Sequence, residues 1–367
     1  MTYLTDKSIL NTAQLIDWYH LNKRDLPWRL TKDPYKIWLS EIILQQTRVA
    51  QGTSYYLKFT TNYPTVNDLA EASEEEVLKD WQGLGYYSRA RNLHTAAKFV
   101  ANEMGGIFPN SYASIRELKG VGDYTSAAIA SFAFDLPHAV VDGNVYRLLS
   151  RLFGIETPID STQGKKQFAS LAQTLLPIDQ AANYNQAIME FGAIQCTPKT
   201  PKCHTCPFSI SCIALKSDQI ERLPIKEKKL KQKKRYLNYL ILESDDELLV
   251  NKRDGKGIWQ NLYDFPMVES ATSISERNLS LSKDFQTLLS GSEFKIVVSS
   301  KERKHILSHQ ILFAKFYHIY ITDKLEVIKG NFEQIKKTEL ANKPIPKLIE
   351  NYLREETNLL SLLGSLN

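Results

Sequence analysis

The sequence predicts two domains of different class, an all-α domain followed by a strand-rich α/β domain. The chain has 367 residues, whereas an ordinary domain takes about 100–200. Up to about residue 220, apolar residues recur every three or four positions between Gly, Pro and Asp breaks, as in amphipathic helices. Beyond residue 235, β-branched and aromatic runs alternate with turn signals, which favours strands.

The predicted helices of the first domain combine helical spacing with start or stop signals. They span Ser8 to Leu21, Pro34 to Phe59, Glu74 to Trp81, Tyr87 to Glu103, Ser111 to Leu118, Thr125 to Phe134, Asn144 to Phe153, Lys165 to Leu176 and Asn183 to Gly192. We therefore expect a helical domain over residues 1–220.

A basic segment separates the two halves. KEKKLKQKKR (226–235) holds seven basic residues and one acid, so it cannot bury a core and is typical of a linker or a solvated arm. We expect a linker over 221–235, a second domain over 236–357 and a tail over 358–367. The predicted strands of the second domain lie in YLNYLILES, ELLVNKRD, EFKIVVSS and ILFAKFYHIYIT.

Composition and charge are those of an ordinary globular protein, with 43% hydrophobic and 24% charged residues. The net charge of +5 permits a polyanionic partner without requiring one. No apolar stretch approaches the roughly 20 residues of a membrane helix, and the polar start MTYLTDKSILN lacks the pattern of a secretory signal. These features predict a cytoplasmic protein.

The stretch LKGVGDYTSAAIA (118–130) places a Gly-Val-Gly turn between two predicted helices. It lacks the lysine of a Walker loop and the third glycine of a Rossmann turn. The pattern instead predicts a helix-hairpin-helix, in which Gly120 and Gly122 let the backbone approach a DNA phosphate of any sequence. The alternative is a plain helical hairpin.

All the cysteines lie close together, spaced C-x6-C-x2-C-x5-C: Cys196, Cys203, Cys206 and Cys212. A reducing cytosol disfavours disulfides. Four thiolates suit either Zn²⁺ or a [4Fe–4S] cluster. Zinc ribbons usually pair two C-x2-C knuckles, and only one exists here, so the spacing favours iron–sulfur.

Together these motifs resemble the endonuclease III-like DNA glycosylases, which combine a helix-hairpin-helix, a loop ending in a catalytic Asp, and this cysteine spacing. The finer similarity is to the adenine DNA glycosylases of the MutY type, and it covers nearly all of the first 220 residues. It is carried by RDLPWR, DPYKIWLSEIILQQTRV, GLGYYSRARNLH and YNQAIMEFGAIQC. The strand-rich remainder is similar to the Nudix-like C-terminal domain of that family.

The resemblance implies a base excision repair enzyme. It would flip out adenine mispaired with 8-oxoguanine, or less readily with guanine, and hydrolyse its N-glycosidic bond. Relatives that also cut the strand carry a lysine after the hairpin turn, where this chain has Tyr124. A tyrosine has no amine to form a Schiff base, so we expect a monofunctional enzyme that leaves an abasic site.

Two carboxylates are the candidate catalytic groups. Glu41 lies among apolar residues, which should raise its pKa and keep a proton available. Asp142, in VVDGN just before a predicted helix, can stay ionised. By resemblance Glu41 is the acid that protonates adenine and Asp142 stabilises the sugar cation, with Asn144 orienting Asp142 and Tyr124 supporting the site. The alternatives are a surface Glu and an N-capping Asp.

The resemblance also assigns binding residues. Those of the adenine pocket are Trp28, Arg29, Leu44 and Gln186. Gln46 and Tyr86 are the wedge residues inserted into the duplex, and the further DNA contacts are Arg24, Thr47, Gly120 and Gly122. Without the resemblance, Trp28 and Tyr86 would be assigned to the core.

The second domain is expected to bind rather than hydrolyse, because VESATSISERNLSLSKDF lacks the clustered acids of a working Nudix enzyme. In the family a Phe-Ser-His loop recognises 8-oxoguanine, and the matching residues here are Leu307, Ser308 and His309. Ser308 and His309 are therefore candidate DNA-binding residues, whereas leucine in place of phenylalanine removes aromatic stacking.

The implied cofactor is a structural [4Fe–4S] cluster on the four cysteines, and the implied partner is double-stranded DNA with an 8-oxoguanine·adenine or guanine·adenine mispair. We expect a monomer. One alternative is a glycosylase on the same scaffold that acts on thymine or damaged pyrimidines. The others are a non-enzymatic iron–sulfur DNA-binding protein and a zinc-dependent transcription factor, the latter disfavoured by the single knuckle.

Overall fold

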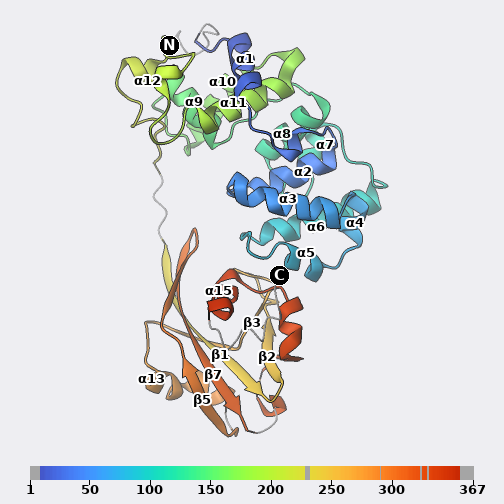
Figure 1. Cartoon of the computed structure of the whole chain (residues 1–367), viewed down its shortest axis with the longest axis vertical. Helices are drawn as coiled ribbons and strands as arrows, with labels where there is room; N and C mark the ends of the chain where they lie inside the picture. The colour runs from blue at the N-terminus through green and yellow to red at the C-terminus, as the bar shows by residue number, and fades with distance from the viewer. Residues whose placement is uncertain (1–8, 228–231, 290, 323–324, 329, 356–367) are drawn as a thin grey trace. The chain divides into compact units, whose positions relative to one another are not determined.

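The chain divides into two compact units in a computed structural model, which describes residues 9–227, 232–289, 291–322, 325–328 and 330–355 (Figure 1). The first unit comprises Met1–Ala72 and Asn92–Lys228, and the second comprises Ser73–Arg91 and Lys229–Asn367. The second unit therefore includes a segment from the middle of the predicted helical domain.

The first unit is all-α, as predicted. Its helices are α1 (Thr12–Asn22), α2 (Pro34–Leu44), α3 (Val49–Asn62), α4 (Val66–Glu71), α7 (Tyr112–Arg116), α8 (Asp123–Phe134), α9 (Gly143–Phe153), α10 (Thr162–Leu175), α11 (Ala181–Ile194) and α12 (Ile213–Lys216). Helix α6 (Ser88–Glu103) begins in the second unit and continues into the first. Short 3₁₀ turns η2 (Pro27–Arg29), η3 (Ile178–Gln180) and η4 (Cys203–Thr205) connect them.

The single helix predicted over Pro34 to Phe59 was wrong, because α2 ends at Leu44 and α3 starts at Val49. Gln46 between them has a left-handed backbone, with φ of 57°. A residue in that region cannot continue a right-handed helix. The prediction also missed α4, whose six residues are too few to show periodicity and whose start is fixed by a capping box between Thr65 and Asp68.

The core of the first unit brings together helices that are distant in the sequence. Val145 and Leu149 of α9 pack with Phe191 of α11, Leu15 of α1 and Phe168 of α10, all fully buried. Burial of each such side chain contributes about 1.5–3 kcal/mol. A smaller cluster, which includes Ala127 and Ala128, lies under α8. This packing holds α9 and α11 together, and Met189 of α11 also packs against the cluster under α8.

The second unit contains a mixed sheet with the strand order β3-β2-β1-β7-β5. Its strands are β1 (Lys233–Ser244), β2 (Glu247–Lys252), β3 (Tyr263–Asp264), β4 (Met267–Ser270), β5 (Phe294–Ser299), β6 (Arg303–Ile306), β7 (Gln310–Ile321) and β8 (Glu333–Lys336). The long strands β1 and β7 are parallel, from Lys233 beside Gln310 to Glu243 beside Tyr320. The other strand pairs are antiparallel.

Helices accompany the sheet: α5 (Glu74–Asp80), α13 (Glu276–Ser280), α14 (Lys283–Leu288) and α15 (Lys347–Glu355), with 3₁₀ turns η5 (Leu325–Val327) and η6 (Lys337–Asn342). Leu240, Leu242 and Ile319 form a core with Phe285 of α14. The β-branched runs identified in the sequence supply β1, β2, β5 and β7, so the strand-rich class is confirmed. Helix α5 corresponds to the helix predicted over Glu74 to Trp81, whereas α13, α14 and α15 were not predicted.

Two of the predicted boundaries meet the structure as follows. Strand β1 starts at Lys233, so the last three residues of the expected 221–235 linker lie in the sheet. The expected 358–367 tail lies outside the described residues. The boundaries at 220 and 357 stay predictions. Among the described residues, no helix has both the length and the apolar character of a membrane span.

Candidate active site

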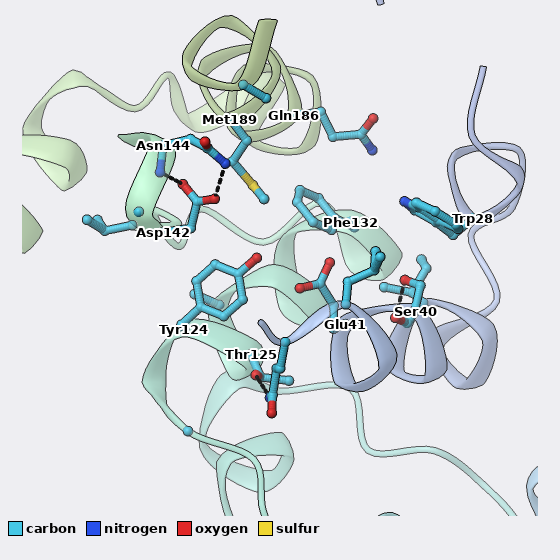
Figure 2. Close-up of a pocket in the computed structure, with 18 of the residues that line it drawn as sticks. Trp28, Ser40, Glu41, Tyr124, Thr125, Phe132, Asp142, Asn144, Gln186 and Met189 are labelled. Carbon is cyan, nitrogen blue, oxygen red and sulfur yellow. Dashed lines mark hydrogen bonds between the residues drawn. The ribbon is translucent and has the colours of Figure 1, made fainter. Parts of the chain in front are cut away.

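A cavity of about 1020 Å³ in the first unit gathers most of the predicted site residues (Figure 2). Its walls come from η2 and α2, from the turn between α7 and α8, from the start of α9 and from one face of α11. The predicted residues on it are Arg24, Trp28, Arg29, Glu41, Leu44, Gln46, Thr47, Gly120, Gly122, Tyr124, Asp142, Asn144 and Gln186. These residues are far apart in the sequence, and the helix packing brings them together around one cavity.

Glu41 lies in the apolar helix α2 and is only 7% exposed. Burial raises the pKa of Glu41 from its ordinary 4.5 to about 7, and the nearby Asp142 adds to the rise. A hydrogen bond from Tyr124 and the positive charge of Arg29 oppose it. The expected rise in pKa is confirmed, and its cause is desolvation. Near neutral pH this carboxyl can therefore hold a proton and release it.

Tyr124 lies between the two carboxylates. Its hydroxyl points to the space between Glu41 and Asp142 in Figure 2, and it hydrogen bonds to Glu41. Burial, followed by the negative charges of Glu41 and Asp142, raises the pKa of Tyr124 well above 10. The phenol is therefore a neutral donor at physiological pH.

Asp142 caps the N-terminus of α9, as its position before a helix predicted. Its Oδ1 accepts the backbone N–H groups of Asn144 at 2.9 Å and of Val145 at 2.8 Å, and its Oδ2 accepts Asn144 Nδ2 at 2.6 Å. Burial raises the pKa of Asp142, and these donors together with Arg147 oppose the rise. The N-cap and the catalytic interpretation are compatible, because the cap holds the carboxylate at the cavity wall.

Arg147 was missed by the sequence analysis. Its Nη2 donates to Asn144 Oδ1 at 2.8 Å, and its Nε donates to the carbonyl oxygen of Cys196 at 2.8 Å. The residue lies one turn after Asn144 on α9, a spacing that places both side chains on one helix face. Arg147 thus fixes the amide that holds Asp142.

The hairpin turn forms another edge of the cavity. Gly120 has φ of 80°, and a Cβ there would lie 2.7 Å from Cβ of Asn92, so a side chain is excluded by both conformation and space. Gly122 is the N-cap of the twelve-residue helix α8. The first N–H groups of that helix lack intrahelical partners and suit a phosphate. The helix-hairpin-helix prediction is confirmed as a fold.

The predicted adenine pocket contains an unexpected hydrogen bond. Trp28 and Leu44 line the cavity, and the Trp28 ring packs edge-on to Tyr56 with centroids 5.4 Å apart. Gln186 points into the cavity (Figure 2) and its Oε1 accepts the hydroxyl of Tyr19 at 2.6 Å. Because Gln186 Oε1 is bound to Tyr19, the Nε2 end of the amide is the one left to face a bound base.

Glu190 is a second residue that the sequence analysis missed. It lies four residues after Gln186, on the same face of α11, and its side chain is 1% exposed. Its carboxylate binds the Nη2 atoms of Arg24 at 2.6 Å and of Arg29 at 2.8 Å. Burial raises the pKa of Glu190, but the hydrogen bonds from both arginines outweigh that effect and hold the pKa at about 2. Phe132 and Met189 also line the cavity unpredicted.

The turn between α2 and α3 exposes Gln46 at the cavity edge. Its left-handed backbone is uncommon for a residue other than glycine. The amide of the adjacent Thr47 donates to the carbonyl of Leu44 at 3.1 Å, which closes the turn. Gln46 and Thr47 are thus presented on a tight loop.

The remaining predicted DNA-binding residues belong to the second unit. Ser308 and His309 lie in the turn between β6 and β7, closed by the Leu307 N–H bonding to the carbonyl of Gln310 at 2.8 Å. The hydroxyl of Tyr86 hydrogen bonds with Ser308 Oγ. The structure therefore groups Tyr86 with Ser308.

The four cysteines line a small separate pocket of the first unit: Cys196, Cys203, Cys206 and Cys212. Burial raises the pKa of the Cys206 thiol to about 11, and the other cysteines add to the rise. Arg151 Nη1 lies 3.4 Å from Cys196 Sγ. Within the described residues, no group of three or more His, Cys, Asp or Glu side chains is arranged to hold a metal ion. The four thiols that line this pocket match the donor set of a [4Fe–4S] cluster, which is held by four Cys thiolates.

Two family models and several known proteins match this chain. Residues 39–174 match the model of the HhH-GPD superfamily base excision DNA repair proteins, and residues 238–355 match the NUDIX domain model. The chain is 35% identical to an adenine DNA glycosylase of Buchnera aphidicola subsp. Baizongia pistaciae, over 88% of this chain and 89% of the relative. It is 32% identical to that of subsp. Schizaphis graminum, over 92% and 96%.

A solved structure with a similar fold is a thermostable thymine-DNA glycosylase, with a TM-score of 0.54 and 33% identity. It covers 57% of this chain and 97% of its own. The matches to the two adenine DNA glycosylases, by contrast, extend over nearly the whole chain, including the part that matches the NUDIX model. The chain therefore belongs to the adenine DNA glycosylases, enzymes of base excision repair that remove adenine from DNA.

Proposed function

We propose that the adenine removed is the one mispaired with 8-oxoguanine and, more slowly, with guanine, and that the product is an abasic site in an uncut strand. The observation that carries the chemical part is the meeting of Glu41, Tyr124 and Asp142 on one cavity, with the pKa of Glu41 raised to about 7. One carboxyl is suited to carry a proton and the other is suited to stay charged.

Glu41 donates its proton to a ring nitrogen of the flipped adenine while the bond to the sugar breaks. The base then leaves as a neutral molecule rather than as a poor anion. Asp142 stabilises the cation that develops on the sugar. Water adds its hydroxyl to the sugar carbon and leaves a proton in the site. Asn144 holds Asp142 in place, and Tyr124 donates to Glu41 once that carboxyl is ionised.

The flipped base is held by Trp28, Arg29, Leu44 and Gln186. Apolar and aromatic side chains supply stacking and exclude water, while the Gln186 amide pairs with an adenine edge. Gln46 and Tyr86 fill the gap left in the duplex, and the hairpin backbone at Gly120 and Gly122 grips a phosphate. Arg24 and Thr47 add contacts to the strand.

Recognition of the opposite base belongs to Ser308 and His309. Both offer hydrogen-bonding groups on a turn, and His309 is exposed. Leu307 contributes apolar contact without aromatic stacking. The hydroxyl of Ser308 is suited to a group that distinguishes 8-oxoguanine from guanine.

A [4Fe–4S] cluster on the four cysteines would cross-link the segment 196–212, which includes Lys199 and Lys202. Brown protein with broad visible absorption, iron and acid-labile sulfide supports this cofactor. Colourless protein that contains zinc contradicts it.

The deciding assay is base release under single turnover from duplexes with adenine opposite 8-oxoguanine, guanine or thymine. We expect free adenine, fastest with 8-oxoguanine, strand cleavage only after alkali, and no adduct on borohydride treatment. The likeness to a thymine-DNA glycosylase makes thymine in a guanine·thymine duplex the necessary comparison. Release of thymine instead of adenine contradicts the proposal.

A further inference from the structure

Residues 73–91 of the second unit, here called the α5 segment, carry Tyr86 into contact with Ser308. The backbone of Tyr86 is left-handed, with φ of 49°. Such a conformation is unfavourable in a residue other than glycine and persists only where the surroundings fix it. The contacts that hold the α5 segment therefore decide where Tyr86 lies.

Glu75 of α5 makes the central one of these contacts. Its Oε2 accepts the hydroxyl of Tyr263 at 3.0 Å, and its Oε1 lies 3.3 Å from Nζ of Lys343. Tyr263 belongs to β3 and is 2% exposed, and Lys343 follows η6. A single carboxylate therefore ties α5 to two separate parts of the second unit.

Lys343 is held in a charged state. Burial lowers its pKa, but Glu333 at 3.0 Å, Glu75 and Tyr263 outweigh this effect and raise the pKa above its ordinary value. The ammonium also lies 4.5 Å from the centroid of the Tyr263 ring. Because the Lys343 side chain is only 17% exposed, the ion pair is screened less than one on an open surface.

Additional hydrogen bonds align the rest of the segment with the same region. They are Lys79 Nζ to the carbonyl of Lys343 at 3.1 Å, the Ile345 N–H to Gln82 Oε1 at 3.1 Å, and Arg91 Nη1 to the carbonyl of Gln260 at 2.9 Å. Asn261 donates to Glu74. Together with the contacts of Glu75, these bonds join the α5 segment to the rest of the second unit.

We propose that Glu75 is a positioning residue for mispair recognition: it holds Tyr86 beside Ser308 before DNA binds, so that both side chains meet the same mispair. This inference rests on the proposed roles of Tyr86 and Ser308. A pair that is already in place loses less conformational freedom on binding. Glu75 itself touches neither DNA nor adenine in this account.

The test is Glu75→Gln, which keeps the size and one acceptor oxygen but removes the charge. The matched control is Glu71→Gln, on the exposed end of α4 in the first unit. We expect Glu75→Gln to lower the preference for 8-oxoguanine·adenine over guanine·adenine, measured as the ratio of kcat/KM, by about three- to ten-fold. The single-turnover rate at saturating enzyme stays unchanged.

Tyr263→Phe removes the hydroxyl that donates to Glu75 Oε2 and keeps the buried ring. It should reduce the preference in the same direction, and the double variant should lose less than the sum, because the two residues share one contact. Full additivity would contradict a shared contact.

Amide hydrogen exchange in the free protein tests the positioning without any reaction. Exchange over residues 84–87 and 307–310 should be faster in Glu75→Gln than in Glu71→Gln. Equal exchange in the two variants overturns the inference. A different result tests the proposed function: it is contradicted if Ser308→Ala leaves the mispair preference unchanged.

Discussion

The cavity around Glu41 and the turn around Ser308 differ most in their exposure to solvent. Glu41 is 7% exposed, whereas Tyr86, the partner of Ser308, is 46% exposed. A proton donor needs desolvation to shift its pKa into the working range. A group that recognises a base opposite the site needs to reach the duplex. In the proposed function, the two tasks therefore belong to different units of the chain.

The two regions also differ in how they are assembled. The cavity takes Glu41 from α2, Tyr124 from α8 and Asp142 from the start of α9, so it exists only in the packed helical core. The β6–β7 turn is a local structure, closed by one backbone hydrogen bond between Leu307 and Gln310. Changes in the cavity should therefore affect catalysis and stability, and changes in the turn should affect preference.

The largest expected effect is that of Glu41→Gln. Glutamine keeps the shape of the side chain but cannot donate a proton of suitable pKa, so adenine release should slow by about 10²–10⁴-fold. Single-turnover kinetics measure it, and binding to an uncleavable duplex serves as the control. A loss below tenfold would mean that Glu41 is not the acid.

Glu190→Gln tests how far the cavity depends on buried charge. It leaves Arg24 and Arg29 without their shared carboxylate, so we expect a loss of about 2–4 kcal/mol in the free energy of unfolding. Glu269→Gln in the second unit is the matched control, because Glu269 pairs with Arg235 at 2.6 Å but is 40% exposed. It should cost less than about 1 kcal/mol. Urea titrations measure the free energy of unfolding of both variants. Equal losses would contradict the expected difference between the buried pair and the exposed pair.

The pH dependence should separate the two regions further. The proton on Glu41 is lost as pH rises through about 7, so the rate should fall about tenfold per pH unit at higher pH. Because the folded pKa lies above the ordinary 4.5, the stability that Glu41 contributes is complete below that value and is lost up to about pH 7. Glu41→Gln should abolish the alkaline fall in rate. An unchanged profile in that variant assigns the titration to another group.

Local signals in the sequence predicted several structural features of the cavity. VVDGN predicted a helix start at Asp142, and the apolar neighbours of Glu41 predicted its raised pKa. The glycines of LKGVGD predicted the hairpin turn, where Gly120 requires a positive φ. The helix start and the hairpin turn are decided within a few residues of the chain, whereas the raised pKa of Glu41 also requires the tertiary packing that buries it.

Features that depend on distant partners were not predictable in this way. Glu190 could be placed on the face of Gln186, but its arginines are more than 160 positions away. The break at Gln46 follows no Gly or Pro signal, and the membership of α5 in the second unit depends on contacts such as Glu75 with Lys343. Tertiary packing determines these features, and the spacing of apolar residues along the chain gives no information about it.

The most direct test of the division between chemistry and recognition is a comparison of Glu41→Gln with Ser308→Ala on duplexes with adenine opposite 8-oxoguanine and opposite guanine. We expect Glu41→Gln to slow both reactions by the same factor. Ser308→Ala should reduce the preference for 8-oxoguanine by about two- to ten-fold and leave the guanine reaction unchanged. A selective effect of Glu41→Gln, or an equal slowing of both reactions by Ser308→Ala, would contradict the account.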